Sequence, residues 1–288
     1  MPKLLVIFAL VKYREIINTL TTAALTVYDP MEARAVARFA AEELWGISST
    51  LLVVNPDGEC SADNLTEVAE RLASGEPVQY VVGSTEWCDL RLEVGRGVLI
   101  PRPETEELVR WIESDHRLCE GLRVVDLGTG SGAIAIALAG RLAGSHVTAF
   151  DISDDALAIA RRNGVAHAPQ VEFLKGDMLT LDPIEGLDIV VSNPPYVPQS
   201  DLDSMHRNVK EWEPHTALFV PDERPLMFYE AVVDFAVRSL KKGGRLYCEI
   251  YEHLAEQTVE MAAQRGLSGG EIRCDIMDRP RMIRWTKA

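Results

Sequence analysis

The feature that most constrains the fold is a regular alternation of strand-like and helix-like segments after Pro101. Short runs rich in Val, Ile and Leu are separated by longer segments in which apolar residues recur at helical intervals. The predicted strands cover 123–127, 146–151, 171–174, 188–192, 245–250, 272–276 and 282–285. Because strands that alternate with helices usually pair in parallel with helices on both faces, the pattern predicts a doubly wound α/β domain.

The chain is predicted to have three parts. Residues 1–75 place apolar side chains three and four positions apart, which predicts a small helical domain, interpreted as a substrate-docking domain. Residues 76–100 contain two β-like runs, 78–82 and 90–94, and are predicted to form a β-hairpin linker. The third part, 101–288, is the α/β domain.

Local signals mark helix ends in the first part. Asp29 before Pro30 predicts a helix start, and Gly46 predicts a helix stop. A turn at 55–58 is expected to separate two further helices. The apolar run 4–11 has eight residues, too few to span a bilayer, and is interpreted as part of an N-terminal helix in a cytoplasmic protein that has no membrane partner.

Composition narrows the classes of partner. The chain has 288 residues, with 29 Lys and Arg against 44 Asp and Glu, which gives a formal charge of −15. This excess of carboxylates repels a phosphate backbone, so no direct contact with nucleic acid is expected. The five cysteines include no close pair, so neither a disulfide framework nor a metal site of the zinc type is expected.

A glycine-rich loop follows the first strand of the α/β domain. It leads into an Ala-rich helix over 133–142, and its candidate ligand-binding residues are Asp126, Gly128, Thr129, Gly130 and Gly132. Glycines allow a tight turn and a close approach of the backbone to a ligand, while the helix start offers free N–H groups. Gly128, Gly130 and Ala133 also match a dinucleotide fingerprint, so a nicotinamide enzyme is a competing interpretation.

Carboxylates after the next two strands favour a nucleoside ligand. Asp151 ends the second predicted strand, where a carboxylate accepts hydrogen bonds from both ribose hydroxyls. Its alternative role is the N-cap of a helix that begins near Asp154. After the third strand, Asp177 is a candidate acceptor for the exocyclic amine of an adenosine, although Gly176 and Asp177 are equally typical of a plain turn.

The fourth predicted strand is followed by Asn193-Pro194-Pro195-Tyr196. The two prolines have no N–H groups, so nearby carbonyl oxygens are left without a backbone partner. The Asn193 amide offers both an acceptor and donors, and Tyr196 adds a flat aromatic face. We expect these groups to hold a planar group that carries an NH₂, either an amide or an exocyclic amine; the alternative is a proline-rich turn that closes the strand.

Together these segments resemble a known family. The glycine loop paired with Asn193-Pro194-Pro195-Tyr196 resembles the S-adenosylmethionine-dependent amino-methyltransferases, which methylate adenine, cytosine or the glutamine amide nitrogen. The segments 76–80, 101–109 and 213–218 narrow the resemblance to the peptide chain release factor N5-glutamine methyltransferases, the HemK/PrmC family, over nearly the whole chain. The combination argues against a nicotinamide dehydrogenase.

The resemblance implies a Rossmann-like, class I S-adenosylmethionine-dependent methyltransferase domain with an N-terminal helical domain and a hairpin linker. The implied substrate is the glutamine of the Gly-Gly-Gln motif of class 1 release factors, whose methylation modulates translation termination, and the implied cofactor product is S-adenosylhomocysteine. Cofactor contacts are implied for Gly128, Gly130, Asp151 and Asn193, with Asp126, Thr129, Gly132, Ile152, Asp177 and Met178 as further candidates. Substrate contacts are expected at Asn193, Pro194, Pro195 and Tyr196, of which Asn193, Pro194 and Tyr196 are the candidate catalytic residues.

Two positions depart from the family pattern. Members usually have Gly after the Glu-Ile that ends the fifth strand, whereas this chain has Tyr251 after Glu249-Ile250. The residue after Asp177, often Trp in relatives, is Met178 here. The first departure bears on the local backbone, and the second bears on the adenine-binding wall.

The expected mechanism uses hydrogen bonding rather than a general base. The Asn193 side-chain oxygen and the Pro194 carbonyl would accept the amide hydrogens and aim the nitrogen lone pair at the sulfonium methyl, so that positioning drives an in-line displacement. None of the six histidines is assigned a catalytic role.

Three other functions remain open. A glutamine methyltransferase of a large-subunit ribosomal protein and an adenine-N6 DNA methyltransferase share the Asn-Pro-Pro-Tyr segment. The charge of −15 counts against DNA. A non-enzymatic binding module is the third alternative, and the intact Asp126, Asp151 and Asn193 count against it.

Overall fold

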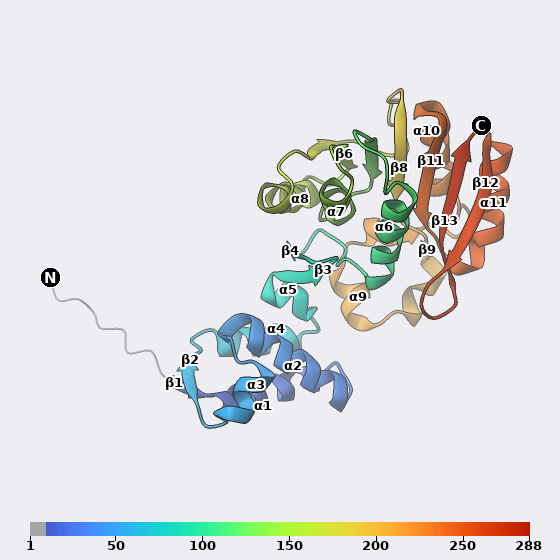
Figure 1. Ribbon diagram of the computed structural model, residues 1–288. Helices are drawn as coiled ribbons and strands as arrows, with labels where there is room; N and C mark the ends of the chain where they lie inside the picture. The colour runs from blue at the N-terminus through green and yellow to red at the C-terminus, as the bar shows by residue number, and fades with distance from the viewer. Residues whose placement is uncertain (1–9) are drawn as a thin grey trace. The chain divides into compact units, whose positions relative to one another are not determined.

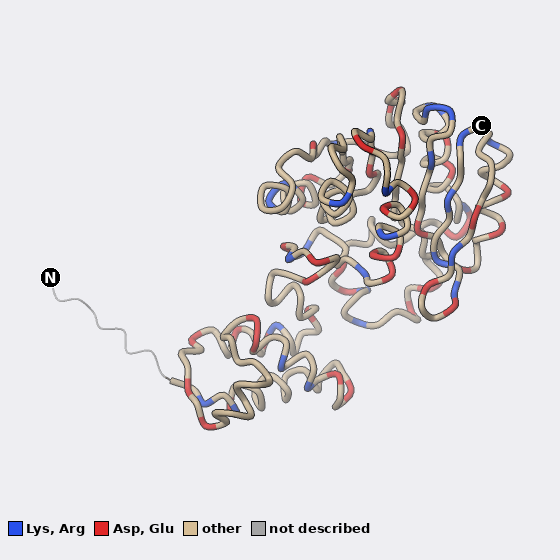
Figure 2. Tube along the Cα trace, in the orientation of Figure 1, with Lys and Arg blue, Asp and Glu red and all other residues tan. Residues whose placement is uncertain are grey.

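The computed structural model describes residues 10–288 and divides the chain into two compact units. One unit holds the described part of Met1–Gly83 together with Met205–Trp212, and the other holds Ser84–Ser204 with Glu213–Ala288. The chain therefore passes from one unit to the other three times, so the first unit is built from two separate stretches of sequence. Lys and Arg are interspersed among Asp and Glu in both units (Figure 2).

The first unit is a small helical bundle (Figure 1). Its elements are β1 (Leu10–Lys12), α1 (Tyr13–Ala24), α2 (Pro30–Trp45), α3 (Ser49–Val54), β2 (Glu59–Ser61), α4 (Leu65–Ala73), α5 (Val78–Val82) and α9 (Arg207–Trp212). Ile16 and Leu20 from α1 and Leu72 from α4 are fully buried in one core. The predicted helix ends are confirmed, because the Asp29 carboxylate accepts hydrogen bonds from two N–H groups at the start of α2 and Gly46 ends that helix with φ +68°.

Two expectations for this unit are wrong. Residues 4–9 of the predicted N-terminal helix lie outside the described residues, and Leu10 and Val11 belong to a strand that pairs antiparallel with β2. The predicted strand over 78–82 is the helix α5, which starts after Pro77 and ends at Gly83 with φ +86°. A five-residue apolar run does not distinguish a strand from a buried helical turn, and burial of Val78 and Val81 in the bundle core decides the outcome.

The short helix α9 comes from the middle of the α/β sequence but packs in the first unit. Asn208 donates a hydrogen bond of 3.2 Å to the Tyr28 hydroxyl, and the His206 ring stacks on the Tyr28 ring with their centroids 5.5 Å apart. Periodicity does not reveal such a contact between residues so distant in sequence.

The second unit begins with a β-hairpin of β3 (Ser84–Trp87) and β4 (Leu90–Glu93). Cys88 and Asp89 form its two-residue turn with φ of +53° and +64°, the backbone that suits the twist of paired strands. The structure therefore contains a hairpin within the predicted linker, formed by different residues on its first strand.

A seven-stranded sheet forms the centre of the second unit, in the order β12-β13-β11-β8-β5-β6-β7. Its strands are β5 (Arg123–Leu127), β6 (His146–Asp151), β7 (Glu172–Lys175), β8 (Leu187–Ser192), β11 (Leu240–Glu249), β12 (Leu267–Cys274) and β13 (Pro280–Lys287). The pairs among β7, β6, β5, β8 and β11 are parallel, and β13 is antiparallel to both of its neighbours. The predicted α/β fold is confirmed, and β5 and β6 have the predicted bounds.

Helices cover both faces of this sheet. The helices are α6 (Pro103–Asp115), α7 (Ala133–Arg141), α8 (Asp154–His167), α10 (Met227–Ser239) and α11 (Ala255–Gln264). Val124 joins the core under α6, α7 and α8, while Val125 joins the opposite core under α10 and α11, because successive side chains of a strand point to opposite faces.

Short elements complete the second unit near the carboxyl ends of its strands. They are β9 (Val197–Pro198), η1 (Gln199–Ser204), η2 (His215–Ala217), β10 (Phe219–Val220) and η3 (Glu252–Leu254). Within residues 10–288, no helix combines the length and apolar character needed to cross a bilayer.

Candidate functional site

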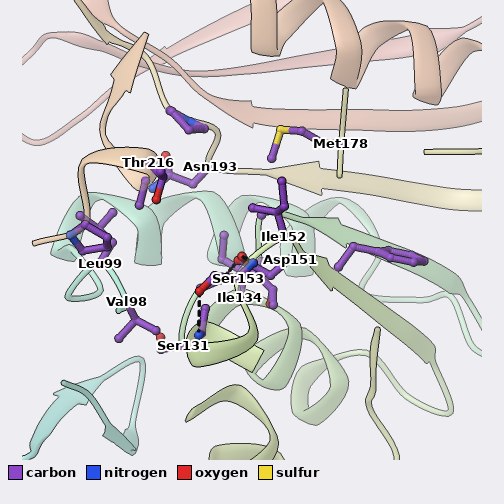
Figure 3. Close-up of a pocket in the computed structure, with 18 of the residues that line it drawn as sticks. Val98, Leu99, Ser131, Ile134, Asp151, Ile152, Ser153, Met178, Asn193 and Thr216 are labelled. Carbon is purple, nitrogen blue, oxygen red and sulfur yellow. Dashed lines mark hydrogen bonds between the residues drawn. The ribbon is translucent and has the colours of Figure 1, made fainter. Parts of the chain in front are cut away.

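A cavity of about 350 Å³ opens in the second unit at the carboxyl ends of the parallel strands. Asp151, Met178 and Asn193 reach it from the loops after three different strands (Figure 3). Of the residues predicted for cofactor or substrate, its walls include Gly128, Thr129, Gly130, Asp151, Ile152, Asp177, Met178, Asn193 and Pro195. This is the edge at which open parallel sheets bind ligands.

The glycine loop between β5 and α7 has a backbone that side chains rarely adopt. Gly128, Gly130 and Gly132 have φ of +77°, +55° and +84°. A Cβ on Gly128 would lie 2.8 Å from the end of the Met178 side chain, on the cavity side of the loop. Gly132 instead packs against Phe173 and is not part of the cavity wall formed by the described residues. The first two glycines therefore allow backbone exposure to a ligand, and the third allows tight packing.

Asp151 joins the second strand of the site to the glycine loop. Its Oδ2 accepts a hydrogen bond of 2.8 Å from the Gly130 N–H, and its Oδ1 accepts one of 2.9 Å from the Ser153 N–H. The side chain that caps α8 is Ser153, which accepts from the Ala156 N–H. Burial raises the pKa of the Asp151 carboxyl, while its backbone donors oppose that shift.

Asp126 lies beneath the loop and not on the cavity wall. Its side chain is fully buried, and its Oδ2 accepts a hydrogen bond of 2.6 Å from the Thr129 hydroxyl. Burial raises the pKa of Asp126 to about 7; the Thr129 hydrogen bond lowers it and the nearby Asp151 charge raises it. Asp126 therefore holds the glycine loop in place through Thr129, whereas a direct contact with the cofactor was expected.

The next loops supply the wall suited to an adenine ring. Ile152, which is 57% exposed, and Met178 both line the cavity (Figure 3). Asp177 Oδ1 accepts a hydrogen bond of 2.9 Å from the Leu179 N–H, as in the plain turn considered from sequence. Asp177 nevertheless lines the cavity, so both of its expected roles are compatible with its position.

The Asn193-Pro194-Pro195-Tyr196 segment contributes only part of the wall that was expected. Asn193 and Pro195 line the cavity, whereas the lining drawn from the described residues does not include Pro194 or the Tyr196 ring. The Tyr196 hydroxyl donates a 2.7 Å hydrogen bond to Glu249, and its ring stacks on Tyr251 with centroids 6.3 Å apart. The Tyr196 ring therefore packs against Tyr251, whereas it was expected from the sequence to flank the substrate.

Glu249 and Thr105 are site residues that sequence reasoning did not identify. Thr105, at the start of α6, lines the cavity and donates a 2.5 Å hydrogen bond to Glu249 Oε2. Asn193 Nδ2 lies 3.4 Å from Thr105 Oγ1. A signal was present, because Glu249 is the last residue of β11 just as Asp151 is the last residue of β6.

Further parts of the wall come from two segments that lie in or next to the family-like stretches 101–109 and 213–218. Val98, Leu99 and Pro101 line one side, and Thr216 and Phe219 line another. Glu213 connects these segments, since its buried carboxylate accepts hydrogen bonds from the Ile100 N–H and the Arg102 guanidinium at 3.1 and 2.5 Å. The two segments are therefore tied together within the second unit.

The donor set of the cavity fits S-adenosylmethionine. A carboxylate at the end of the second strand suits a ribose diol, exposed glycine backbone suits the amino-acid part, and apolar side chains suit an adenine ring. The Asn193 side-chain amide lines the same cavity. The site therefore combines a nucleoside-binding half with an amide-bearing half.

Comparisons with known proteins agree with this arrangement. Residues 19–83 match the PrmC N-terminal domain, and residues 104–211 match the methyltransferase small domain. Among solved structures, a methyltransferase from Pyrococcus furiosus has a TM-score of 0.50 and 19% identity, covering 68% of this chain and 88% of that chain. That likeness concerns the fold alone.

Two curated relatives match nearly the full length. The release factor glutamine methyltransferase of Bacteroides thetaiotaomicron is 38% identical over 262 residues, covering 89% of this chain and 94% of the relative. The release factor glutamine methyltransferase of Flavobacterium psychrophilum is 37% identical over 269 residues, covering 91% and 94%. Because these relatives are more than 30% identical over about nine tenths of its length, this chain belongs to the release factor glutamine methyltransferase family.

Proposed function

We propose that this protein transfers a methyl group from S-adenosylmethionine to the side-chain amide nitrogen of the glutamine in the Gly-Gly-Gln motif of class 1 release factors. The observation that carries the proposal is the presence of Asn193 in the same cavity as the glycine loop and Asp151. Membership of the family supports the reaction class, an S-adenosylmethionine-dependent glutamine methyltransferase.

The cofactor would occupy the half of the cavity formed by the loops after β5, β6 and β7. Asp151 would accept hydrogen bonds from the ribose hydroxyls, and Ile152 and Met178 would pack against the adenine ring. The backbone at Gly128 and Gly130 would approach the amino-acid part, held in place by Asp126 below. When bound, the cofactor supplies an electrophilic methyl group on a sulfonium.

The chain's own residues would prepare the substrate amide. An amide nitrogen is a weak nucleophile, because its lone pair is delocalised into the carbonyl. The Asn193 side-chain oxygen would accept one amide hydrogen, and the carbonyl of Pro194, which stands between the cavity-lining Asn193 and Pro195, would accept the other and so orient the nitrogen. The proton can leave after nitrogen becomes cationic, so this arrangement requires no general base before transfer.

The decisive experiment compares three substrates. The protein and labelled S-adenosylmethionine are incubated with a whole class 1 release factor, with large-subunit ribosomal proteins, or with DNA. We expect label on the release factor glutamine, removed when that glutamine is replaced by alanine. Label on ribosomal protein or on adenine in DNA would favour the corresponding alternative and contradict the proposal.

The role of the helical unit and the cellular location stay predictions. We propose that the first unit docks the release factor, since the described residues that line the cavity all belong to the second unit. The prediction of a cytoplasmic enzyme rests on the sequence arguments given above.

A further inference from the structure

A buried carboxylate outside the cavity lining is connected to the proposed amide-binding residue. Glu249, at the end of β11, is 2% exposed, and each of its oxygens accepts one hydroxyl hydrogen. Thr105 donates to Oε2 at 2.5 Å, and Tyr196 donates to Oε1 at 2.7 Å. The Thr105 hydroxyl in turn lies 3.4 Å from the Asn193 side-chain nitrogen. Asn193 and Thr105 line the cavity, so the chain of contacts starts in the protein interior and ends at the site.

The Glu249 carboxylate sets the direction of the hydrogen bonds along this series of contacts. An ionised carboxylate can only accept hydrogen bonds, and a threonine hydroxyl has one hydrogen. Because that hydrogen is directed to Glu249, Thr105 Oγ1 can only accept from its other neighbour. The Asn193 NH₂ group satisfies this requirement, whereas its oxygen in the same place would face another oxygen with no hydrogen between them. The Asn193 oxygen is consequently left available to the cavity.

Charged and titratable groups from several elements surround Glu249. Burial raises the pKa of the Glu249 carboxyl, and Glu104 on α6 adds to the rise. The Thr105 and Tyr196 hydrogen bonds and the Arg281 charge on β13 act in the opposite direction. Tyr229 on α10 lies near the same carboxylate, and Asp275 accepts a hydrogen bond from Arg281. The hydroxyl donors and Arg281 are thus what favour the anion at this buried position.

We infer that Glu249 is a positioning residue that, through Thr105, orients the Asn193 amide with its oxygen toward the substrate. This inference rests on the proposed function, because that function assigns the Asn193 oxygen to the amide hydrogens of the substrate glutamine. A cavity that presented the Asn193 NH₂ group instead would place two sets of N–H donors against each other. Glu249 touches neither substrate nor cofactor in this assignment.

The sharpest test replaces Thr105 rather than the buried acid. Thr105→Val keeps the shape of the side chain and removes the hydroxyl, and Thr105→Ser keeps the hydroxyl and removes the methyl group. We expect Thr105→Val to lower the single-turnover rate of methyl transfer about tenfold or more, the scale of one lost orienting hydrogen bond. Thr105→Ser is the conservative variant and should recover most of the rate that Thr105→Val loses. The dissociation constant for S-adenosylmethionine should be nearly unchanged in both.

A double-mutant cycle separates positioning from general damage. If Thr105 acts through Asn193, Thr105→Val should have little further effect in an Asn193→Ala background. Equal rates for Thr105→Val and the unmodified protein, or full additivity of the two substitutions, would overturn the inference. Glu249→Gln should behave like Thr105→Val, because the Gln amide nitrogen can donate to Thr105 and release its hydroxyl hydrogen. Asp188→Asn, a change to a buried acid at the start of β8, is the matched control.

One readout does not depend on the identity of the substrate. Hydrogen exchange of the Asn193 side-chain NH₂, followed by NMR with labelled asparagine, reports the hydrogen bond to Thr105 directly. Exchange should accelerate in Thr105→Val and Glu249→Gln, and should be unaltered in Thr105→Ser and Asp188→Asn. Unaltered exchange in Thr105→Val would contradict the positioning role. Altered exchange together with no methylation of any release factor by the unmodified protein would instead contradict the proposed function.

Discussion

The Asp151 carboxylate accepts a 2.8 Å hydrogen bond from the backbone N–H of Gly130. Gly130 lies in the loop after β5 and Asp151 is the last residue of β6, so this contact joins the glycine turn to the neighbouring strand. A backbone N–H group that points at a carboxylate is a strong, charge-assisted donor. The half of the cavity proposed to bind the nucleoside is therefore held together by a contact within the protein itself.

Asp151→Ala should weaken S-adenosylmethionine binding by roughly tenfold or more, because the ribose loses charge-assisted hydrogen bonds and Gly130 loses its partner. Isothermal titration calorimetry measures the change. The control is Asp154→Ala, which removes a carboxylate at the start of α8 that is 74% exposed and pairs with Lys175 at the end of β7. Equal affinities for the Asp151 variant and the control would contradict the ribose assignment.

Asn193→Ala should lower methyl transfer to a Gly-Gly-Gln substrate by roughly tenfold to a hundredfold, because the amide acceptor and the orientation it provides are both lost. Asn193→Asp should also lose activity, since an anion would crowd charge beside the substrate carbonyl. Cofactor affinity should largely survive in both variants. Single-turnover rates matching the unmodified protein would mean that this segment is only a proline-rich strand end.

Tyr196→Phe should cost less than Asn193→Ala, because its hydroxyl bonds to Glu249 and its ring is not part of the described cavity lining. We expect a loss of turnover of less than about tenfold together with a modest loss of stability, the scale of one buried hydrogen bond. Parallel rate and urea-unfolding measurements check this order. A larger loss in Tyr196→Phe than in Asn193→Ala would contradict this order and would indicate that the Tyr196 hydroxyl itself takes part in the reaction.

Asp126→Asn should increase stability at alkaline pH relative to the unmodified protein. The pKa of the folded Asp126 carboxyl is about 7, above the unfolded value of 3.8, so its protonated form is favoured on folding. That contribution is complete below the unfolded pKa and is lost as pH rises toward about 7. Asparagine removes the dependence, with a gain of up to a few kcal/mol at pH 8. Urea unfolding of both proteins at pH 5 and pH 8 measures the stability gained by Asp126→Asn. An equal gain at the two pH values would contradict the raised pKa of Asp126.

Removing residues 1–83 should leave cofactor binding intact, because the described cavity residues lie in the second unit. Methylation of a whole release factor should fall strongly, whereas a short Gly-Gly-Gln peptide should remain a substrate at its own rate. Equal rates on the whole factor with and without this segment would contradict a docking role. Since α9 then loses its partners, Tyr28→Ala in the full chain is the milder companion, which removes the contacts to His206 and Asn208 together with the packing of this one ring in the bundle core.

The family departure at Tyr251 has a structural consequence. Tyr251 adopts an ordinary extended backbone with φ −76°, so the loss of glycine introduces no strain there. Its ring stacks on Tyr196, and its hydroxyl donates a 2.6 Å hydrogen bond to Asp201. Tyr251 therefore links the Asn-Pro-Pro-Tyr segment to η1.

Local sequence by itself predicted the seven strands of the sheet, although β11, β12 and β13 begin earlier than predicted. β5 and β6 were predictable to the residue, because each is a short run with buried apolar residues at its centre, and Gly128 follows β5 while the acidic Asp151 ends β6. Asp151 and Asn193 could be placed at one cavity for the same reason, since parallel strands end on the same edge of a sheet.

Only the tertiary structure decided the side-chain directions and the distant contacts. Residues 78–82 form a helix because the bundle core buries them, although the run alone suits a strand. The hydrogen bond between Thr105 and Glu249 joins residues 144 positions apart, and the Tyr196 hydroxyl donates to the other oxygen of the same acid. A periodic pattern records which face of an element is buried, but not which polar partner a buried side chain meets across the core, and that partner decides where its hydrogen bonds point.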